Sequence, residues 1–309
     1  MRRQSTTSTA CARGCSVNNT VLITGATGFI GRPLAARLRG EGREVVAIGS
    51  AQGDIADPAT LRPMADRGIG HVVHLAGRTY VPESWAEPRA FFDTNAGGTL
   101  NVLEFCRAAG ASLTFLSAYL YGIPERLPIA EDAPVRPNNP YALSKHLAEE
   151  ACRFYSAQHG VAVGIARVFN VFGPGQDARF LIPTILSQLQ RDPAVEVRDL
   201  APRRDYVYLD DAVDALAKLA AARPKMATYN VASGTSRSVG DIIAAFQAAL
   251  GTRKPVIGKS DLRHNEIPEV IGDASRAAAD LGWRPKVSFE QGAARLVQES
   301  VAANTRLRA

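Results

Sequence analysis

An apolar stretch that runs into closely spaced glycines is the feature that most restricts how this chain can fold. It reads VLITGATGFIG over residues 21–31 and continues into the amphipathic residues 32–38. This pattern predicts a buried strand, a tight turn and a helix. Gly25 lets the chain leave the strand sharply, Gly28 leaves room for a ligand at the backbone, and Gly31 allows the helix to pack closely on the strand.

A turn of this kind predicts a dinucleotide-binding site. The amide groups that begin the helix face the phosphates, and the helix dipole favours their negative charge. Glycine-rich turns also serve as plain connectors, so the strand before the turn and the amphipathic helix after it are the context that favours a cofactor.

Strand and helix patterns alternate along the rest of the chain. The predicted strands lie at 43–48, just before Gly53 as a short extended segment, and at 71–77, 112–117, 161–169 and 229–234. The predicted helices lie at 90–110, 139–160, 239–250 and 274–281. This alternation predicts an α/β fold of the Rossmann type, a doubly wound parallel sheet covered by helices.

The 309 residues suffice for one large domain or two smaller ones. We expect residues 1–19 to form a disordered leader rich in Ser, Thr and Arg. Residues 20–169 together with 206–233 form the expected dinucleotide-binding domain. Residues 170–205 together with 234–305 form a smaller, discontinuous C-terminal domain for the substrate.

The formal net charge of +6 is concentrated at the two ends of the chain, where residues 1–20 and 301–309 contain arginines and no acid. The nearly neutral body argues against a nucleic-acid partner. The first twenty residues lack the apolar core of a secretory signal, although a short organelle-targeting peptide stays open. No apolar stretch reaches membrane-spanning length, so we expect no membrane partner. Cysteine is rare, which is typical of reduced thiols in a cytoplasmic protein.

The end of the second strand bears on the choice of cofactor. Proteins of this fold that are specific for NAD place a carboxylate there for the adenosine ribose, whereas this chain has Gly49 and Ser50. Arg32 and Arg43 are candidate partners for a 2′-phosphate, and each is alternatively an ordinary surface arginine. The sequence therefore favours NADP(H) and leaves NAD(H) open.

Residues after two later strands are placed to contact the same cofactor. Asp54 is expected at the adenine, with Ile55 packing on the ring. The small final residues of the strand at 71–77 let the cofactor backbone pass close by. His71 and His74 are three apart on that strand and point to opposite faces, so no metal site is expected.

The segment NPYALSK at residues 139–145 begins the long predicted helix, with Asn139 as N-cap and Pro140 at the first helical position. Tyr141 and Lys145 are one turn apart and share a face. A phenol with a pKa of about 10 needs roughly 4 kcal/mol of stabilisation to act as a base near neutral pH. A neighbouring ammonium and an oxidised nicotinamide supply it. The alternative is a packed tyrosine beside a solvated lysine.

Several motifs occur in a characteristic order: TGATGFIG, GD, HLAG, a lone Asn95 on a helix, a strand that ends in a serine, and YALSK. Together they resemble the extended short-chain dehydrogenase/reductases, the NAD-dependent epimerase/dehydratase family. That family includes nucleotide-sugar epimerases, dehydratases and 4-keto reductases, and the resemblance runs from about Thr20 to Glu299. It implies an NAD(P)-dependent enzyme that acts at C4 of a nucleotide-diphosphate sugar and forms a homodimer through the YxxxK helix and the preceding helix.

Carried over by position, the resemblance makes Tyr141 the catalytic acid and base. It makes Lys145 the residue that lowers the phenol pKa and holds the nicotinamide ribose, and Asn95 a support of the active site. The expected cofactor contacts are Gly25, Thr27, Gly28, Phe29, Ile30, Gly31, Arg32, Ser50, Asp54, Ile55, Leu75, Ala76, Gly77, Asn95, Tyr141, Lys145 and Val168.

The family's catalytic hydroxyl lies four residues before the tyrosine of a Tyr-Gly pair. Counting back from Tyr121 gives Ser117, which would hydrogen-bond the sugar oxygen that gains or loses a proton. If the strand end is offset by one residue, the position is Ala118 instead. The dehydratase branch carries an Asp-Glu pair in this loop, and Tyr119 and Leu120 exclude that reaction.

The resemblance also assigns the substrate side. Asn170, in the segment RVFNVFGPGQ, corresponds to a residue that meets the substrate diphosphate, and Arg204 and Arg263 correspond to phosphate-binding arginines. Arg78 and Tyr80 lie in a loop similar to that of GDP-4-keto-6-deoxymannose reductases. For any single arginine the alternative is a solvated side chain.

Three functions remain open. A 4-keto-6-deoxy-sugar reductase that uses NADPH is favoured by this loop and by the missing carboxylate after the second strand. A 4-epimerase of the UDP-glucose type, with tightly held NAD, uses the same serine, tyrosine and lysine. A non-catalytic NADP(H)-binding protein of the same fold is the third alternative.

Overall fold

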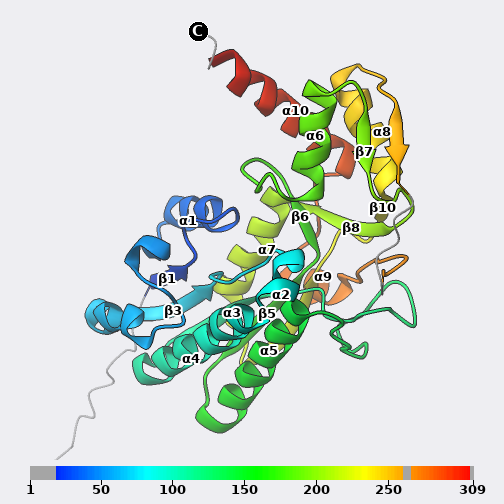
Figure 1. Ribbon diagram of the computed structural model, residues 1–309. Helices are drawn as coiled ribbons and strands as arrows, with labels where there is room; N and C mark the ends of the chain where they lie inside the picture. The colour runs from blue at the N-terminus through cyan, green and yellow to red at the C-terminus, as the bar shows by residue number, and fades with distance from the viewer. Residues whose placement is uncertain (1–18, 260–265, 307–309) are drawn as a thin grey trace, which may run out of the picture.

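The computed structural model describes residues 19–259 and 266–306, so the expected leader, apart from Asn19, lies outside the described residues. Its centre is a sheet of six parallel strands in the order β2-β1-β3-β4-β5-β9 (Figure 1). These strands are β1 (Thr20–Thr24), β2 (Glu44–Ile48), β3 (Ile69–His74), β4 (Ser112–Ala118), β5 (Val163–Val168) and β9 (Met226–Val231). The predicted Rossmann-type parallel sheet is confirmed.

Helices pack on both faces of this sheet. They are α1 (Gly31–Gly40), α4 (Gly98–Ala109), α5 (Pro140–His159), α7 (Leu209–Ala222) and α9 (Ser275–Leu281), whereas α2 (Val81–Ala86) and α3 (Pro88–Phe91) pack against α5. Strand β1 explains the two layers, because side chains alternate along a strand. Val21 and Ile23 join the core that includes α1 and α7, whereas Leu22 joins the core that includes α4 and α5.

The remaining elements form a smaller lobe, which Figure 1 shows beyond the end of the parallel sheet. They are β6 (Asn170–Phe172), α6 (Leu181–Arg191), β7 (Val195–Val197), β8 (Arg203–Tyr208), β10 (Ser236–Ser238), α8 (Val239–Leu250), β11 (Val256–Gly258) and α10 (Phe289–Arg306). The strands form a sheet β10-β8-β6 and a pair β11-β7. Phe172 and Phe246 both contact the ring of Phe289 in the core of this lobe.

The long predicted helices are present. α5, α8 and α9 occupy the ranges expected for them, and the Asn139 side chain caps α5 by accepting from the Ala142 amide at 2.8 Å. The helix predicted at 90–110 begins earlier, at α3, and is interrupted by a π-helix at Phe92–Gly97 before α4.

One element was predicted wrongly. The residues before Gly53 form a 3-10 helix, Ser50–Gln52, instead of an extended segment, and a longer 3-10 helix follows at Pro58–Arg67. The Gln52 side chain accepts from the Gly49 amide at 2.8 Å, which folds these residues into a turn. The Gln52 backbone amide also donates to the Gly49 carbonyl at 3.0 Å, so local hydrogen bonds of the turn compete here with a strand.

The two histidines of β3 are core residues on opposite faces, as the spacing predicts. The His74 ring bonds the hydroxyls of Thr24 and Thr99, and the His71 ring bonds two hydroxyls of β4. Burial lowers the pKa of each ring to about 3, so both are neutral. Among the described helices, none has the length and apolarity needed to span a bilayer.

The glycine that begins α1 provides a test of this packing. A Cβ at Gly31 would lie 2.1 Å from the Gly25 carbonyl oxygen, whereas a Cβ at Gly40, in the same helix, would meet nothing within 4 Å. We expect Gly31→Ala to lower the free energy of unfolding by about 1–3 kcal/mol. Gly40→Ala should leave it unchanged or raise it by up to about 1 kcal/mol. Urea unfolding measures both, and equal stability of the two variants would contradict the packing described.

Candidate functional site

A cavity of about 530 Å³ lies where the parallel strands end. We call it the strand-end cavity. Its walls include residues that follow β1, β3, β4 and β5, together with the start of α5 and parts of the smaller lobe. This edge of a parallel sheet is where proteins of the fold bind ligands.

Most of the predicted cofactor residues meet at this cavity. Those that line it are Gly25, Gly28, Phe29, Ile30, Gly31, Leu75, Gly77, Tyr141, Lys145 and Val168. Thr27 and Arg32 line a neighbouring cavity of about 720 Å³ instead, with Gly28 and Phe29 at both. Ser50, Asp54, Ile55, Ala76 and Asn95 line neither of the two cavities.

The glycine turn packs tightly on the end of β3. Gly25 has a φ of +69°, and a Cβ there would lie 2.7 Å from the Ala76 amide nitrogen. That amide in turn donates to the Thr24 hydroxyl at 3.2 Å. Only a glycine fits this approach, which keeps the turn beside the cavity.

The residues after β2 lie where the adenosine end of the cofactor is expected. The Arg32 Nε donates to the Thr27 carbonyl at 2.8 Å, and a Cβ at Gly49 would lie 2.4 Å from the Thr27 hydroxyl. The glycine turn, the guanidinium and the end of β2 are therefore neighbours. No carboxylate lies in the turn formed by residues 49–53.

Asp54 and Ile55 are held by local contacts. The Asp54 carboxylate accepts from the Ala56 amide at 3.0 Å. The Ile55 side chain is buried, and a Cβ added at Gly98 of α4 would lie 2.7 Å from it. Ile55 thus packs within the core of the main sheet.

Tyr141 and Lys145 lie on the first two turns of α5. The Lys145 ammonium is buried, donates to the Leu116 carbonyl at 2.9 Å and lies 4.9 Å from the centre of the Phe115 ring. Burial lowers the pKa of Lys145 to about 8 and raises the pKa of Tyr141 above its ordinary value. Without a bound ligand, the phenol therefore keeps its proton at neutral pH.

Asn95 fixes the loop after β3 against α5. Its Oδ1 accepts from the Arg78 amide at 2.9 Å, and its Nδ2 donates to the Arg78 carbonyl at 3.1 Å and to the Ser144 hydroxyl at 2.9 Å. A Cβ at Gly77 would lie 2.8 Å from Asn95 Oδ1. The buried asparagine therefore supports the site from behind the loop.

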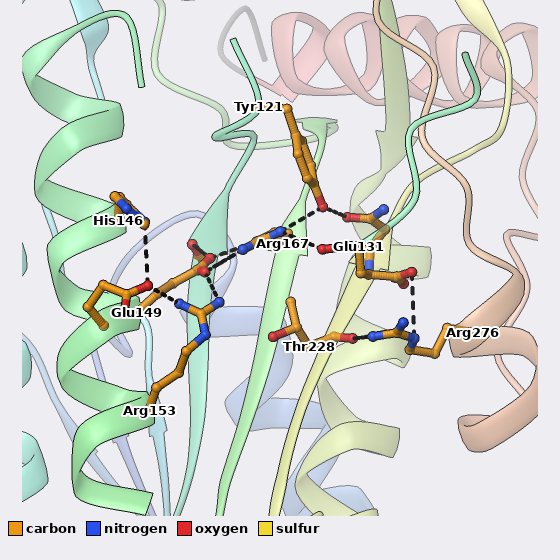
Figure 2. Close-up of polar contacts among 11 residues, drawn as sticks. Tyr121, Glu131, His146, Glu149, Arg153, Arg167, Thr228 and Arg276 are labelled. Carbon is orange, nitrogen blue, oxygen red and sulfur yellow. Dashed lines mark hydrogen bonds and ion pairs between the residues drawn. The ribbon is translucent and has the colours of Figure 1, made fainter. Parts of the chain in front are cut away.

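Ser117 borders the strand-end cavity, but its hydroxyl proton is directed elsewhere. The Oγ donates to Glu149 Oε1 at 2.6 Å. The same carboxylate accepts from Arg167 Nε at 2.9 Å and Nη2 at 2.7 Å, and from Arg153 at 2.8 Å (Figure 2). The sequence predicts a bond from Ser117 to a sugar oxygen, whereas in the structure the serine donates to Glu149.

The ion pair continues into a network across the sheet. Arg167 Nη1 donates to the Tyr121 hydroxyl at 2.9 Å and to the Glu131 carbonyl at 3.1 Å, and the Tyr121 hydroxyl donates to Asn230 at 2.7 Å (Figure 2). Burial by itself raises the pKa of Glu149, but the hydrogen bonds and charge of Arg167 outweigh it and hold that pKa below its ordinary value.

Sequence reasoning assigned no role to Glu149 or Arg167. The available signal was spacing, because Tyr141, Lys145 and Glu149 follow each other at intervals of four on one helix. A carboxylate on the buried face of a helix requires a partner, and Arg167 lies on a predicted buried strand.

The expected substrate residues are spread around the cavity. Asn170 lines it and donates to the Asp205 carbonyl at 3.1 Å. Arg204 does not line it, because its guanidinium bonds the Ile267 carbonyl at 2.6 Å and pairs with Glu266. Arg263 lies outside the described residues.

Arg78 and Tyr80 also lie outside the cavity wall. The Arg78 guanidinium pairs with Glu83 at 3.3 Å and Glu87 at 2.9 Å. The Tyr80 ring lies 4.6 Å from the guanidinium of Arg179, a residue of the smaller lobe that does line the cavity and that the sequence analysis missed. Arg179 also pairs with Glu83 at 3.3 Å, so the two lobes touch beside the cavity.

Comparison with known proteins agrees with this arrangement. The model of the NAD dependent epimerase/dehydratase family matches residues 21–232. The chain belongs to this family.

Two relatives and one solved structure illustrate the range of proteins in this family. GDP-6-deoxy-D-mannose reductase of Pseudomonas aeruginosa is 31% identical over 284 residues, covering 88% of this chain and 93% of the relative. UDP-glucose 4-epimerase of Azospirillum brasilense is 32% identical over 304 residues, covering 86% and 87%. The structure of RMD from Pseudomonas aeruginosa complexed with NADPH is 29% identical, with a TM-score of 0.84, and covers 92% of this chain and 99% of that one.

Proposed function

We propose that the protein is an NAD(P)-dependent oxidoreductase that acts at C4 of a nucleotide-diphosphate sugar, and that it reduces a 4-keto-6-deoxy sugar. The observation that carries this proposal is the strand-end cavity, which brings the glycine turn together with Tyr141 and Lys145. The similarity to a GDP-6-deoxy-D-mannose reductase supports the reductive direction.

NADPH is the favoured cofactor. Residues 49–53, directly after β2, include no carboxylate to bind a free 2′-hydroxyl or to repel a 2′-phosphate. Arg32 lies beside Thr27 and the end of β2, where a guanidinium can pair with that phosphate. The related Pseudomonas structure is described as complexed with NADPH.

The proposed chemistry uses two side chains on the first two turns of α5. When bound, the reduced nicotinamide supplies a hydride to C4 of the keto sugar. The Tyr141 phenol, whose pKa is raised by burial, gives its proton to the carbonyl oxygen, which becomes a hydroxyl. The Lys145 ammonium stabilises the phenolate that remains and binds the nicotinamide ribose.

We assign the smaller lobe, residues 170–205 and 234–305, to the nucleotide sugar, with residues 20–169 and 206–233 holding the cofactor. Asn170 lines the cavity and is proposed to meet the diphosphate. Arg204, Arg78 and Tyr80 would reach the substrate only after leaving their present partners, so we propose that they contact it only once it has bound.

A 4-epimerase is the second candidate. The observation in its favour is the similarity to UDP-glucose 4-epimerase of Azospirillum brasilense, which matches the similarity to the reductase. Both reactions use Tyr141 and Lys145, and they differ in whether the dinucleotide leaves the protein after each turnover.

The proposed reaction requires the Tyr141 phenol. We expect wild-type protein to oxidise NADPH in the presence of GDP-4-keto-6-deoxy-D-mannose. Tyr141→Phe should lower kcat by about 10²–10⁴-fold, because it removes the proton donor. Tyr155→Phe, on the same helix but away from the cavity, is the matched control and should keep full activity. The fall in NADPH absorbance measures the activity of the wild-type protein and both variants. Undiminished activity of Tyr141→Phe would contradict the assignment.

We also propose a cytoplasmic homodimer formed through α4 and α5. The cytoplasmic location is proposed because the thiols of Cys106 and Cys152 are free. Leu100, Leu143, Leu147 and Phe154 are large apolar side chains left exposed on these two helices. Light scattering at micromolar concentration should give a dimeric mass, which Leu147→Glu combined with Phe154→Glu should reduce to that of the monomer. A monomeric mass for the wild-type protein would contradict this proposal.

A further inference from the structure

The smaller lobe contributes one cationic side chain, that of Arg179, to the described wall of the strand-end cavity. Arg179 lies between β6 and α6, and its side chain is about half exposed. The other cation of the described wall is the buried ammonium of Lys145, which comes from α5 in the main lobe. A negatively charged ligand that reaches the smaller lobe therefore meets Arg179.

Two carboxylates and one aromatic ring hold the Arg179 guanidinium. Its Nε and Nη2 donate to the Asp177 carboxylate, with Nη2 at 2.9 Å from Oδ2. Its Nη1 donates to Glu83 Oε2 at 3.3 Å, and its central carbon lies 4.6 Å from the centre of the Tyr80 ring. Asp177 belongs to the same loop as Arg179, whereas Glu83 lies on α2 in the main lobe. Nη1 is therefore the donor by which the smaller lobe bonds the main lobe here.

The bond between Arg179 and Glu83 can be exchanged at little cost. Both side chains are partly exposed, and an exposed ion pair contributes little to stability. Glu83 keeps a second partner, because its Oε1 accepts from Arg78 at 3.3 Å. Arg179 likewise keeps its bonds to Asp177, which fix the plane of the guanidinium. Breaking the bond thus leaves neither charge buried and unpaired.

We propose that Arg179 Nη1 binds the diphosphate of the nucleotide sugar, and that Glu83 occupies this donor until the substrate arrives. The inference rests on the proposed function, which requires a nucleotide-diphosphate sugar in this cavity. Phosphate oxygens accept charge-assisted hydrogen bonds from a guanidinium as carboxylate oxygens do, so one anionic acceptor replaces another. Substrate binding therefore breaks a bond between the two lobes.

Arg204 is less accessible to a ligand than Arg179. Its guanidinium donates to the Ile267 carbonyl at 2.6 Å, pairs with Glu266, and does not line the cavity. More must be broken before Arg204 reaches a phosphate than before Arg179 does. Arg179 is thus the arginine already placed for the first contact with the diphosphate.

The substitutions Arg179→Gln and Glu83→Gln, alone and combined, test this assignment. Arg191→Gln is the matched control, because Arg191 lies at the far end of α6, the helix after Arg179, and lines neither of the two cavities. Titration calorimetry on the wild-type protein identifies the diphosphate probe, GDP or UDP, that binds more tightly. The hexose probe is then GDP-6-deoxy-D-mannose or UDP-glucose. The Kd for NADPH reports on the main lobe.

We expect Arg179→Gln to weaken the diphosphate probe and the hexose probe about tenfold each, because both lose a charged hydrogen bond. Glu83→Gln should tighten both about twofold to fivefold, because it removes the competing charge. In the double variant the second substitution should bring no gain, since it acts through Arg179. Arg191→Gln should change none of these constants, and NADPH should bind all the variants as it binds the wild-type protein.

Several results would overturn the inference. Unchanged affinity of Arg179→Gln would show that Arg179 contacts no phosphate, and a loss confined to the hexose probe would place it at the sugar. An equal loss of NADPH affinity would give Arg179 a role in the fold. A gain from Glu83→Gln that persists in the double variant would assign the competition to Arg78. A wild-type protein that binds no nucleotide sugar contradicts the proposed function itself.

Discussion

The buried ion pair between Arg167 and Glu149 sets the position of the candidate site. It joins β5 to α5 near the carboxyl end of the strand, and Ser117 attaches β4 to the same carboxylate. Loss of either charged partner would leave the other buried and unpaired, at a cost of about 3–5 kcal/mol. These contacts tie α5 to β4 and β5, and they place Lys145 and Tyr141, one and two turns before Glu149, at the strand ends.

The contacts of α5 with the sheet explain how Tyr141 and Lys145, two side chains on a helix, are positioned for proton transfer. Lys145 is buried and Tyr141 is partly buried, and loss of water moves their pKa values in opposite directions, that of the phenol upward and that of the ammonium to about 8. Their environment depends on the contacts beneath them, including the bond from Lys145 to the Leu116 carbonyl of β4. The smaller lobe closes the other side of the cavity through Arg179 and its pair with Glu83.

Local patterns were sufficient to predict the main sheet, the glycine turn and the helix that carries Tyr141. Each depends on periodicity or turn chemistry within a few residues, as with Asn139 at the start of α5. Local patterns do not predict which groups a buried polar side chain will bond. Glu149 is 32 residues from Ser117 and 18 from Arg167, and no local rule connects them. The 3-10 helix at Ser50–Gln52 was missed because its turn is held by local hydrogen bonds, among them the one from the Gly49 amide to the Gln52 side chain.

The central claim is that the strand-end cavity binds a dinucleotide that exchanges with each turnover. The most direct test is to denature the purified protein and identify, by mass and absorbance, the dinucleotide it releases, and then to measure the affinity of the empty protein for NADPH and NADH. The account predicts little bound nucleotide and tighter binding of NADPH. Near-stoichiometric NAD would contradict an exchangeable cofactor and favour the epimerase, and affinity for neither would contradict the enzyme itself.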